Sequence, residues 1–98
     1  MRMITLEEHV ATPEYYRLTG AQPANAYIAA IEKKLADLGE GRLADMDAAG
    51  ITMQVLSLTA MGMERLEAAA TTFLAMDTND VISQAVNAHP DRFAAFAV

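Results

Sequence analysis

The stretch Met3-Ile4-Thr5-Leu6-Glu7-Glu8-His9-Val10 decides the fold class, because it alternates apolar and polar residues as a half-buried β-strand does. Thr12-Pro13 follows, and proline cannot continue a strand ladder, so the strand is predicted to end near Val10. In a regular strand successive side chains point to opposite faces. The predicted strand therefore has one face with Ile4, Leu6, Glu8 and Val10 and another with Thr5, Glu7 and His9.

Helices and two further strands are predicted to follow. A loop insertion of about residues 11–27 carries one helical turn. Apolar residues at helical spacing then predict two helices over about 28–38 and 43–49, or one helix with a weak point at Gly39-Glu40-Gly41. Gly50 suits the left-handed residue that ends a helix. Residues 52–59 form a second strand, residues 63–88 a long helix with Phe73 on its inner face, and residues 92–98 begin a third strand.

The order β-α-β-α-β predicts an α/β fold with parallel strands joined by helical crossovers. Three such strands leave an apolar inner face and at least one open edge, whereas parallel sheets normally have both covered. The 98 residues are too few for two domains. The chain is predicted to be a single partial domain, residues 1–98, equivalent to the N-terminal portion of a (β/α)8 TIM barrel, for which ~250 residues are typical.

Glu7 and His9 are the candidate metal ligands. At positions i and i+2 of a strand they emerge on one side, roughly 6 to 7 Å apart along the chain. Carboxylate oxygen and imidazole nitrogen bind divalent cations, and zinc and manganese suit this pair about equally. A solvated or hydrogen-bonded pair is the alternative interpretation. His89 precedes the third strand, so it is expected at the opposite end of the barrel, too far away to share the ion.

Two residues are candidates for contacting a substrate. Thr59 ends the second strand on the same parity as Ser57, which would place both hydroxyls on the barrel interior near its rim. Tyr15 lies in the loop after the first strand and could line a pocket for a flat ligand. Hydroxyl bonding to nearby backbone and simple packing are the alternatives.

Composition excludes several classes of partner. Seven Lys and Arg against thirteen Asp and Glu give a net charge of −6, and the basic residues are scattered, so neither nucleic acid nor an anionic membrane is an expected partner. Cysteine is absent, and no apolar run approaches the ~18 residues that span a bilayer. The expected location is the cytoplasm.

A series of short blocks carries a family resemblance. The blocks are Leu6-Glu7-Glu8-His9, Arg42-Leu43, Met46-Asp47-Ala48-Ala49-Gly50-Ile51, Gln54-Val55-Leu56-Ser57-Leu58, Ala75 to Asp80, His89-Pro90-Asp91-Arg92-Phe93 and Ala95-Phe96-Ala97. In this order they resemble the opening of amidohydrolase-related (amidohydrolase 2) proteins, and most of all the γ-resorcylate and 2,3-dihydroxybenzoate decarboxylases. The resemblance covers essentially the whole chain.

The resemblance implies a metal-dependent (β/α)8 barrel that decarboxylates a hydroxylated aromatic acid without an organic cofactor. It places metal ligands at Glu7 and His9, in agreement with the strand argument. The remaining ligands, a His and an Asp, and the acid/base His of the family lie on later strands, so no catalytic residue is expected within this chain. Family members are roughly three times as long, so the chain alone is expected to be inactive.

Three hypotheses follow. The leading one is the N-terminal part of a metal-dependent decarboxylase acting on a small aromatic carboxylate, with the remaining barrel segment or further copies of the chain as partners. The second is a metal-dependent hydrolase of lactones or related carbonyl compounds on the same scaffold. The third is a small α/β interaction module without enzymatic activity, whose edges are buried by self-association.

Overall fold

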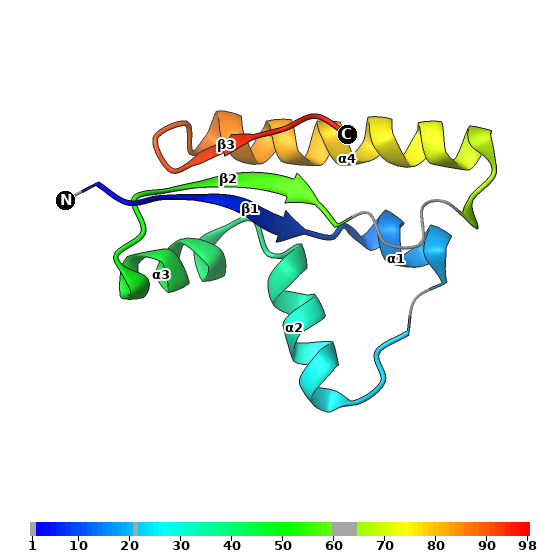
Figure 1. Cartoon of the computed structure of the whole chain (residues 1–98), viewed down its shortest axis with the longest axis horizontal. Coiled ribbons are helices and arrows are strands. Elements are labelled where there is room, and N and C mark those ends of the chain that lie inside the picture. Colours follow the sequence, from blue (N-terminus) through cyan, green and yellow to red (C-terminus); the bar gives the residue numbers. More distant parts are fainter. Residues whose placement is uncertain (1, 21, 60–64) are drawn as a thin grey trace.

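A computed structural model describes residues 2–20, 22–59 and 65–98. Its sheet has three strands in the order β1-β2-β3, all parallel (Figure 1). The strands are β1 (Ile4–Val10), β2 (Met53–Leu58) and β3 (Phe93–Ala95). The α/β class and the parallel pairing predicted from the sequence are confirmed.

Within the described ranges, four helices connect these strands: α1 (Pro13–Thr19), α2 (Ala26–Ala36), α3 (Glu40–Ala49) and α4 (Ala68–Ala88). Thr12 caps α1 by accepting a hydrogen bond from the Tyr15 amide, and Asn25 caps α2 in the same way at Ile28. Gly50 ends α3 with a φ of 73°, the left-handed conformation predicted for it. The loop predicted over residues 11–27 thus contains a helix of seven residues rather than a single turn.

The long helix α4 corrects two predictions. It begins at Ala68, because Glu67 is extended; the predicted start at Met63 lies outside the described residues. Phe73 was predicted on the inner face, and this was wrong, since its side chain is half exposed. The buried stripe is one residue further on, at Leu74, Thr78, Ile82 and Ala85.

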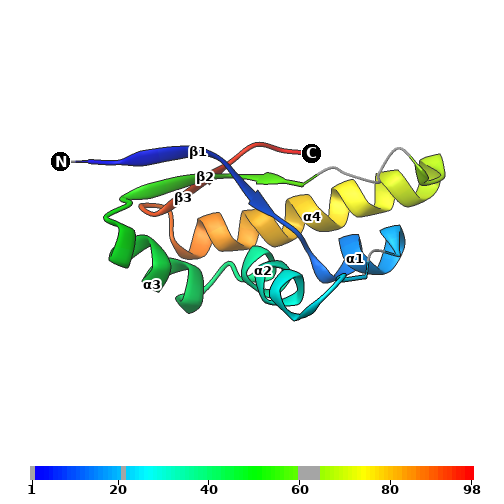
Figure 2. The ribbon, with the colours of Figure 1, turned by 60° about the horizontal axis from the view of Figure 1, so that its bottom comes forward.

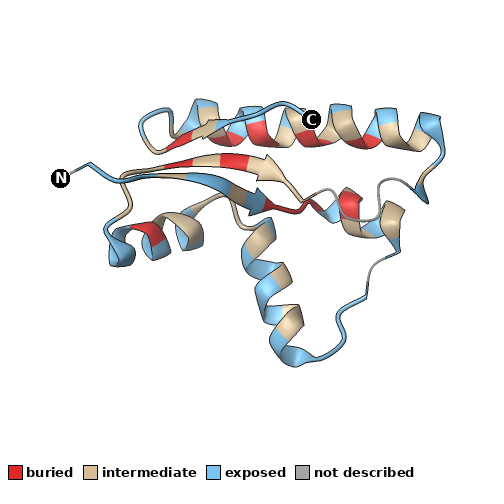
Figure 3. Ribbon diagram, in the orientation of Figure 1, coloured by how far each residue is buried: buried red, intermediate tan, exposed pale blue. Residues whose placement is uncertain are grey.

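The described helices lie on one side of the sheet, and the opposite side has no covering layer among the described residues (Figure 2). The main core lies between β-sheet and helices and contains Val10, Met46, Leu56, Ile82 and Phe93. A second cluster joins Ala11, Tyr15 and Leu74. Buried residues accordingly line the sheet and the sheet-facing side of α4 (Figure 3). This one-sided layering leaves the interior face of the predicted barrel open.

The first strand is not regular. Thr5 pairs with Gln54 and Glu8 pairs with Leu56, so Leu6 and Glu7 together oppose one residue of β2. This β-bulge reverses the facing of side chains before it. Thr5 now shares the helix-covered face with Glu8 and Val10, and its hydroxyl is buried without a hydrogen-bond partner. The predicted alternation along the whole strand was therefore wrong upstream of the bulge.

No helix within the described ranges is both long and apolar enough to cross a membrane.

Candidate metal-binding site

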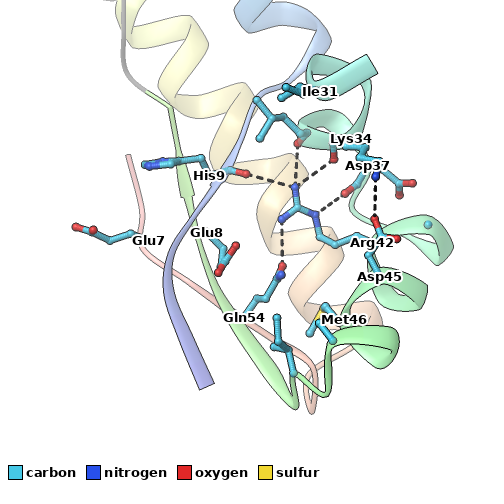
Figure 4. A pocket seen from close by; sticks show the side chains of 14 residues that line it. Glu7, Glu8, His9, Ile31, Lys34, Asp37, Arg42, Asp45, Met46 and Gln54 are labelled. Atoms are coloured by element: carbon cyan, nitrogen blue, oxygen red, sulfur yellow. Dashed lines mark hydrogen bonds and ion pairs between the residues drawn. The ribbon is translucent and has the colours of Figure 1, made fainter. Parts of the chain in front are cut away.

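Glu7 and His9 project together from β1. Both side chains lie on the side of the strand away from Arg42, whereas Glu8 points toward Arg42 (Figure 4). The pairing agrees with this, because His9 is opposite Ser57 on the open face and Glu8 is opposite the buried Leu56. Glu7 and His9 were predicted to share one side of the strand, and they do so in the structure, where Glu7 lies in the bulge and His9 follows it.

Glu7 holds an uncommon backbone conformation. Its φ is +55°, the one positive value among the described residues other than glycine. For a residue with a Cβ atom the left-handed region costs on the order of 1–2 kcal/mol, and such strain concentrates at functional sites where surrounding contacts enforce it. Bulges near functional sites commonly redirect a side chain. Here the bulge sets the direction of the Glu7 carboxylate.

The donor set of Glu7 and His9 fits a divalent cation in part. Both residues are exposed, and neither side chain makes a hydrogen bond or ion pair with another described residue, so a carboxylate and an imidazole are available. Within the described ranges no group of three or more His, Cys, Asp or Glu residues could hold a metal ion. A catalytic site usually has three or more protein ligands. The pair can therefore form half of such a site, and further ligands would have to come from elsewhere.

The second strand contributes hydroxyls near His9. Ser57 pairs directly with His9, and the Thr59 amide donates to the Val10 carbonyl at 2.9 Å. Thr59 therefore lies just past the end of β2, beside the end of β1. Thr59 and His9 therefore lie at the same end of the sheet. Contact of Thr59 with a substrate stays a prediction.

Tyr15 lies in α1 rather than in an open loop. Only 5% of it is exposed, and it belongs to the cluster of Ala11 and Leu74, with its ring edge-on to Tyr16 at 5.5 Å between centroids. Packing is thus a clear role for this ring. Contact of Tyr15 with a substrate remains a prediction.

His89 follows α4 just before β3, and its ring lies edge-on to Phe93, which pairs with Gln54. Gln54 is the partner of Thr5, whereas His9 pairs with Ser57, three residues further along β2.

The structural role of Arg42 was not predicted from the sequence. Its guanidinium donates to the carbonyls of Asp37 (2.6 Å), Lys34 (3.3 Å), Leu35 (3.2 Å) and His9 (3.3 Å) and to the Gln54 side chain (3.1 Å). A signal was present: Arg42 lies in the first turn of α3, where the helix dipole disfavours a positive charge. A basic residue at that place indicates specific contacts.

The surroundings of Arg42 balance its charge. Burial lowers the pKa of its guanidinium, and the carboxylates of Glu8, Asp37 and Asp45 act in the opposite direction. Arginine nevertheless remains charged in proteins. The guanidinium lies on an open groove of about 690 Å³ between β1 and the helices α2 and α3.

Comparisons with known proteins bear on this geometry. The chain is 34% identical over 95 residues to the γ-resorcylate decarboxylase of Rhizobium radiobacter and 33% identical to that of Rhodococcus jostii, covering 96% of this chain and 29% of each relative. The chain is similar to the N-terminal third of aromatic acid decarboxylases. The resemblance predicted from the sequence is confirmed. No protein-family model matches the chain.

Solved structures of such decarboxylases share the fold. A 5-carboxyvanillate decarboxylase from Novosphingobium aromaticivorans, with bound manganese and a nitrobenzoic acid ligand, has a TM-score of 0.90 at 31% identity, matching 98% of this chain and 33% of its own. A dihydroxybenzoic acid decarboxylase from Polaromonas, with manganese and 2-nitroresorcinol, has a TM-score of 0.82 at 31% identity, matching 100% of this chain and 30% of its own. These decarboxylases are TIM barrels, so the chain has the fold of the N-terminal part of a (β/α)8 barrel.

Proposed function

We propose that this chain forms the N-terminal part of a metal-dependent enzyme that removes the carboxylate of a hydroxylated aromatic acid without oxidation. The observation that carries the proposal is the pair Glu7 and His9, unpartnered among the described residues and directed from one side of β1. The similarity to aromatic acid decarboxylases, two of which hold manganese in solved structures, supports it. The barrel protein that would contain this chain is called the complete enzyme below.

In this proposal Glu7 and His9 hold the divalent cation, either manganese or zinc, together with ligands outside the chain. A cation bound there would supply Lewis-acid polarisation of substrate oxygens. Thr59, just past the end of β2 beside β1, and Tyr15, whose ring is buried, would be the substrate contacts that this chain supplies. The acid/base group lies outside residues 1–98, so the chain alone is expected to be inactive.

The partners in this proposal are a small aromatic carboxylate and either the remaining barrel segment or further copies of the chain. The open face and the free edge of β1 support this, because parallel sheets are normally covered on both faces. A cytoplasmic location stays a prediction from the sequence.

Product analysis of the complete enzyme tests the proposed reaction. With 2,6-dihydroxybenzoate, the bond between the ring and the carboxylate is expected to break, with CO2 released and a proton taking its place on the ring to give resorcinol. Liquid chromatography of the products measures this directly. Hydrolysis of lactones without release of CO2 from any dihydroxybenzoate would instead establish the hydrolase, and absence of both activities in a metal-loaded sample would favour the interaction module.

A further inference from the structure

The bulge in β1 needs an external support, because its geometry is unfavourable by itself. Leu6 and Glu7 share one partner position on β2, and Glu7 has a φ of +55°. Both bulge residues are exposed, so their side chains supply little packing to hold this conformation. Contacts on either side of the bulge must therefore maintain it.

Arg42 bonds β1 after the bulge and β2 beside the residue that precedes it. Downstream of the bulge, its Nη2 atom donates to the carbonyl of His9 at 3.3 Å. Upstream, its Nη1 atom donates at 3.1 Å to the buried side chain of Gln54, the residue paired with Thr5. One planar guanidinium thus joins β1 at His9 to β2 at Gln54 (Figure 4).

The same guanidinium is itself fixed to the helical layer. It donates to the carbonyls of Lys34 and Leu35 near the C-terminal end of α2 and to that of Asp37, which follows. The Lys34 carbonyl also accepts from the Asp37 amide and the Leu35 carbonyl from the Ala11 amide, each at 3.2 Å, so the guanidinium joins a backbone network at the end of α2. The fork of five N–H donors on a rigid plane makes this possible, and lysine lacks it.

We infer that Arg42 is a positioning residue for the proposed metal ligands. It acts from the helix-covered side of β1, holding the bulge so that the Glu7 carboxylate and the His9 imidazole both lie on the open side. This inference rests on the proposed function, since it concerns the same pair. Arg42 touches neither side chain directly, and its effect passes through the backbone carbonyl of His9.

The test compares Arg42→Lys with a matched control, Arg92→Lys. Arg92 likewise joins several backbone segments. Its guanidinium donates to the carbonyls of Thr52 and Ile51 and to the Asp47 carboxylate, and none of these hydrogen bonds is to β1. In the ¹⁵N-labelled, metal-free complete enzyme, Arg42→Lys is expected to lower the backbone order parameters of residues 6–9, and Arg92→Lys to leave them unchanged. The affinity for Mn²⁺, measured by paramagnetic broadening at His9, is expected to fall about tenfold in Arg42→Lys only.

The outcomes separate the inference from the proposed function. Equal order parameters and equal Mn²⁺ affinity in wild type and Arg42→Lys would overturn the inference while leaving the metal pair intact. Wild-type complete enzyme that shows no broadening at His9 would overturn the proposed metal role, and with it the inference. Should Arg42→Lys fail to fold, Gln54→Met removes one acceptor of the same guanidinium and is expected to change both measurements in the same direction; no change would again overturn the inference.

Discussion

Replacing His9 by alanine, or Glu7 by glutamine, is expected to abolish metal retention by the complete enzyme. Each substitution removes one of the two donors that this chain supplies, and the remaining ligands cannot close the coordination shell alone. Loss of an outer-shell partner already lowers metal affinity about 10- to 100-fold, so loss of a direct ligand should exceed 100-fold. Mass spectrometry of the metal content after dialysis measures the effect.

Glu8→Gln is the matched control for this prediction. Glu8 lies between the two proposed ligands in sequence but points to the opposite side of β1, toward Arg42. Its variant is expected to retain the wild-type metal content. Full metal content in Glu7→Gln or His9→Ala, or an equal loss in Glu8→Gln, would contradict the assignment of the pair.

Leu56→Ala is expected to lower the free energy of unfolding of the chain by about 2–5 kcal/mol. Leu56 is fully buried on the middle strand of the described sheet, and it contacts the core that joins β1, α3, α4 and β3. Small domains have only about 5–15 kcal/mol of stability. Urea denaturation followed by circular dichroism should therefore show a large shift of the midpoint, or a chain already unfolded without urea.

Leu6→Ala provides the same chemical change at an exposed position. Leu6 lies in the bulge of β1 and is 67% exposed, so its side chain buries little apolar surface on folding. Its variant is expected to unfold within about 0.5 kcal/mol of wild type. Similar losses in the two variants would show that β2 is not the centre of the core.

The fold followed from signals that are local in sequence. Apolar alternation at β1, the run of apolar residues at β2 and Gly50 at the end of α3 each predicted the correct element, because backbone preference and burial agree there. The prediction for α4 was less accurate, because the alanines in this segment give a weak periodic signal. Packing against the sheet selected the stripe of Leu74 and Ile82, and Phe73 was left half exposed.

The site was only partly predictable. Glu7 and His9 were found from residue type and spacing, but the regular strand assumed for them does not exist. The support that we infer for the bulge comes from Arg42 and Gln54, which are distant from it in sequence and which hydrogen-bond to each other. Counting charges treated Arg42 as one of several scattered cations, whereas its place in the first turn of α3 was the informative feature.

Titration of the metal-free, ¹⁵N-labelled complete enzyme with Mn²⁺ tests the central claim most directly, because a bound paramagnetic ion broadens the signals of nearby nuclei. The predicted result is selective broadening of the amides of Glu7 and His9 and of Ser57, which pairs with His9. Broadening centred instead on the exposed carboxylates of α3, such as Asp45 and Asp47, or no selective broadening at all, would contradict a metal site at Glu7 and His9.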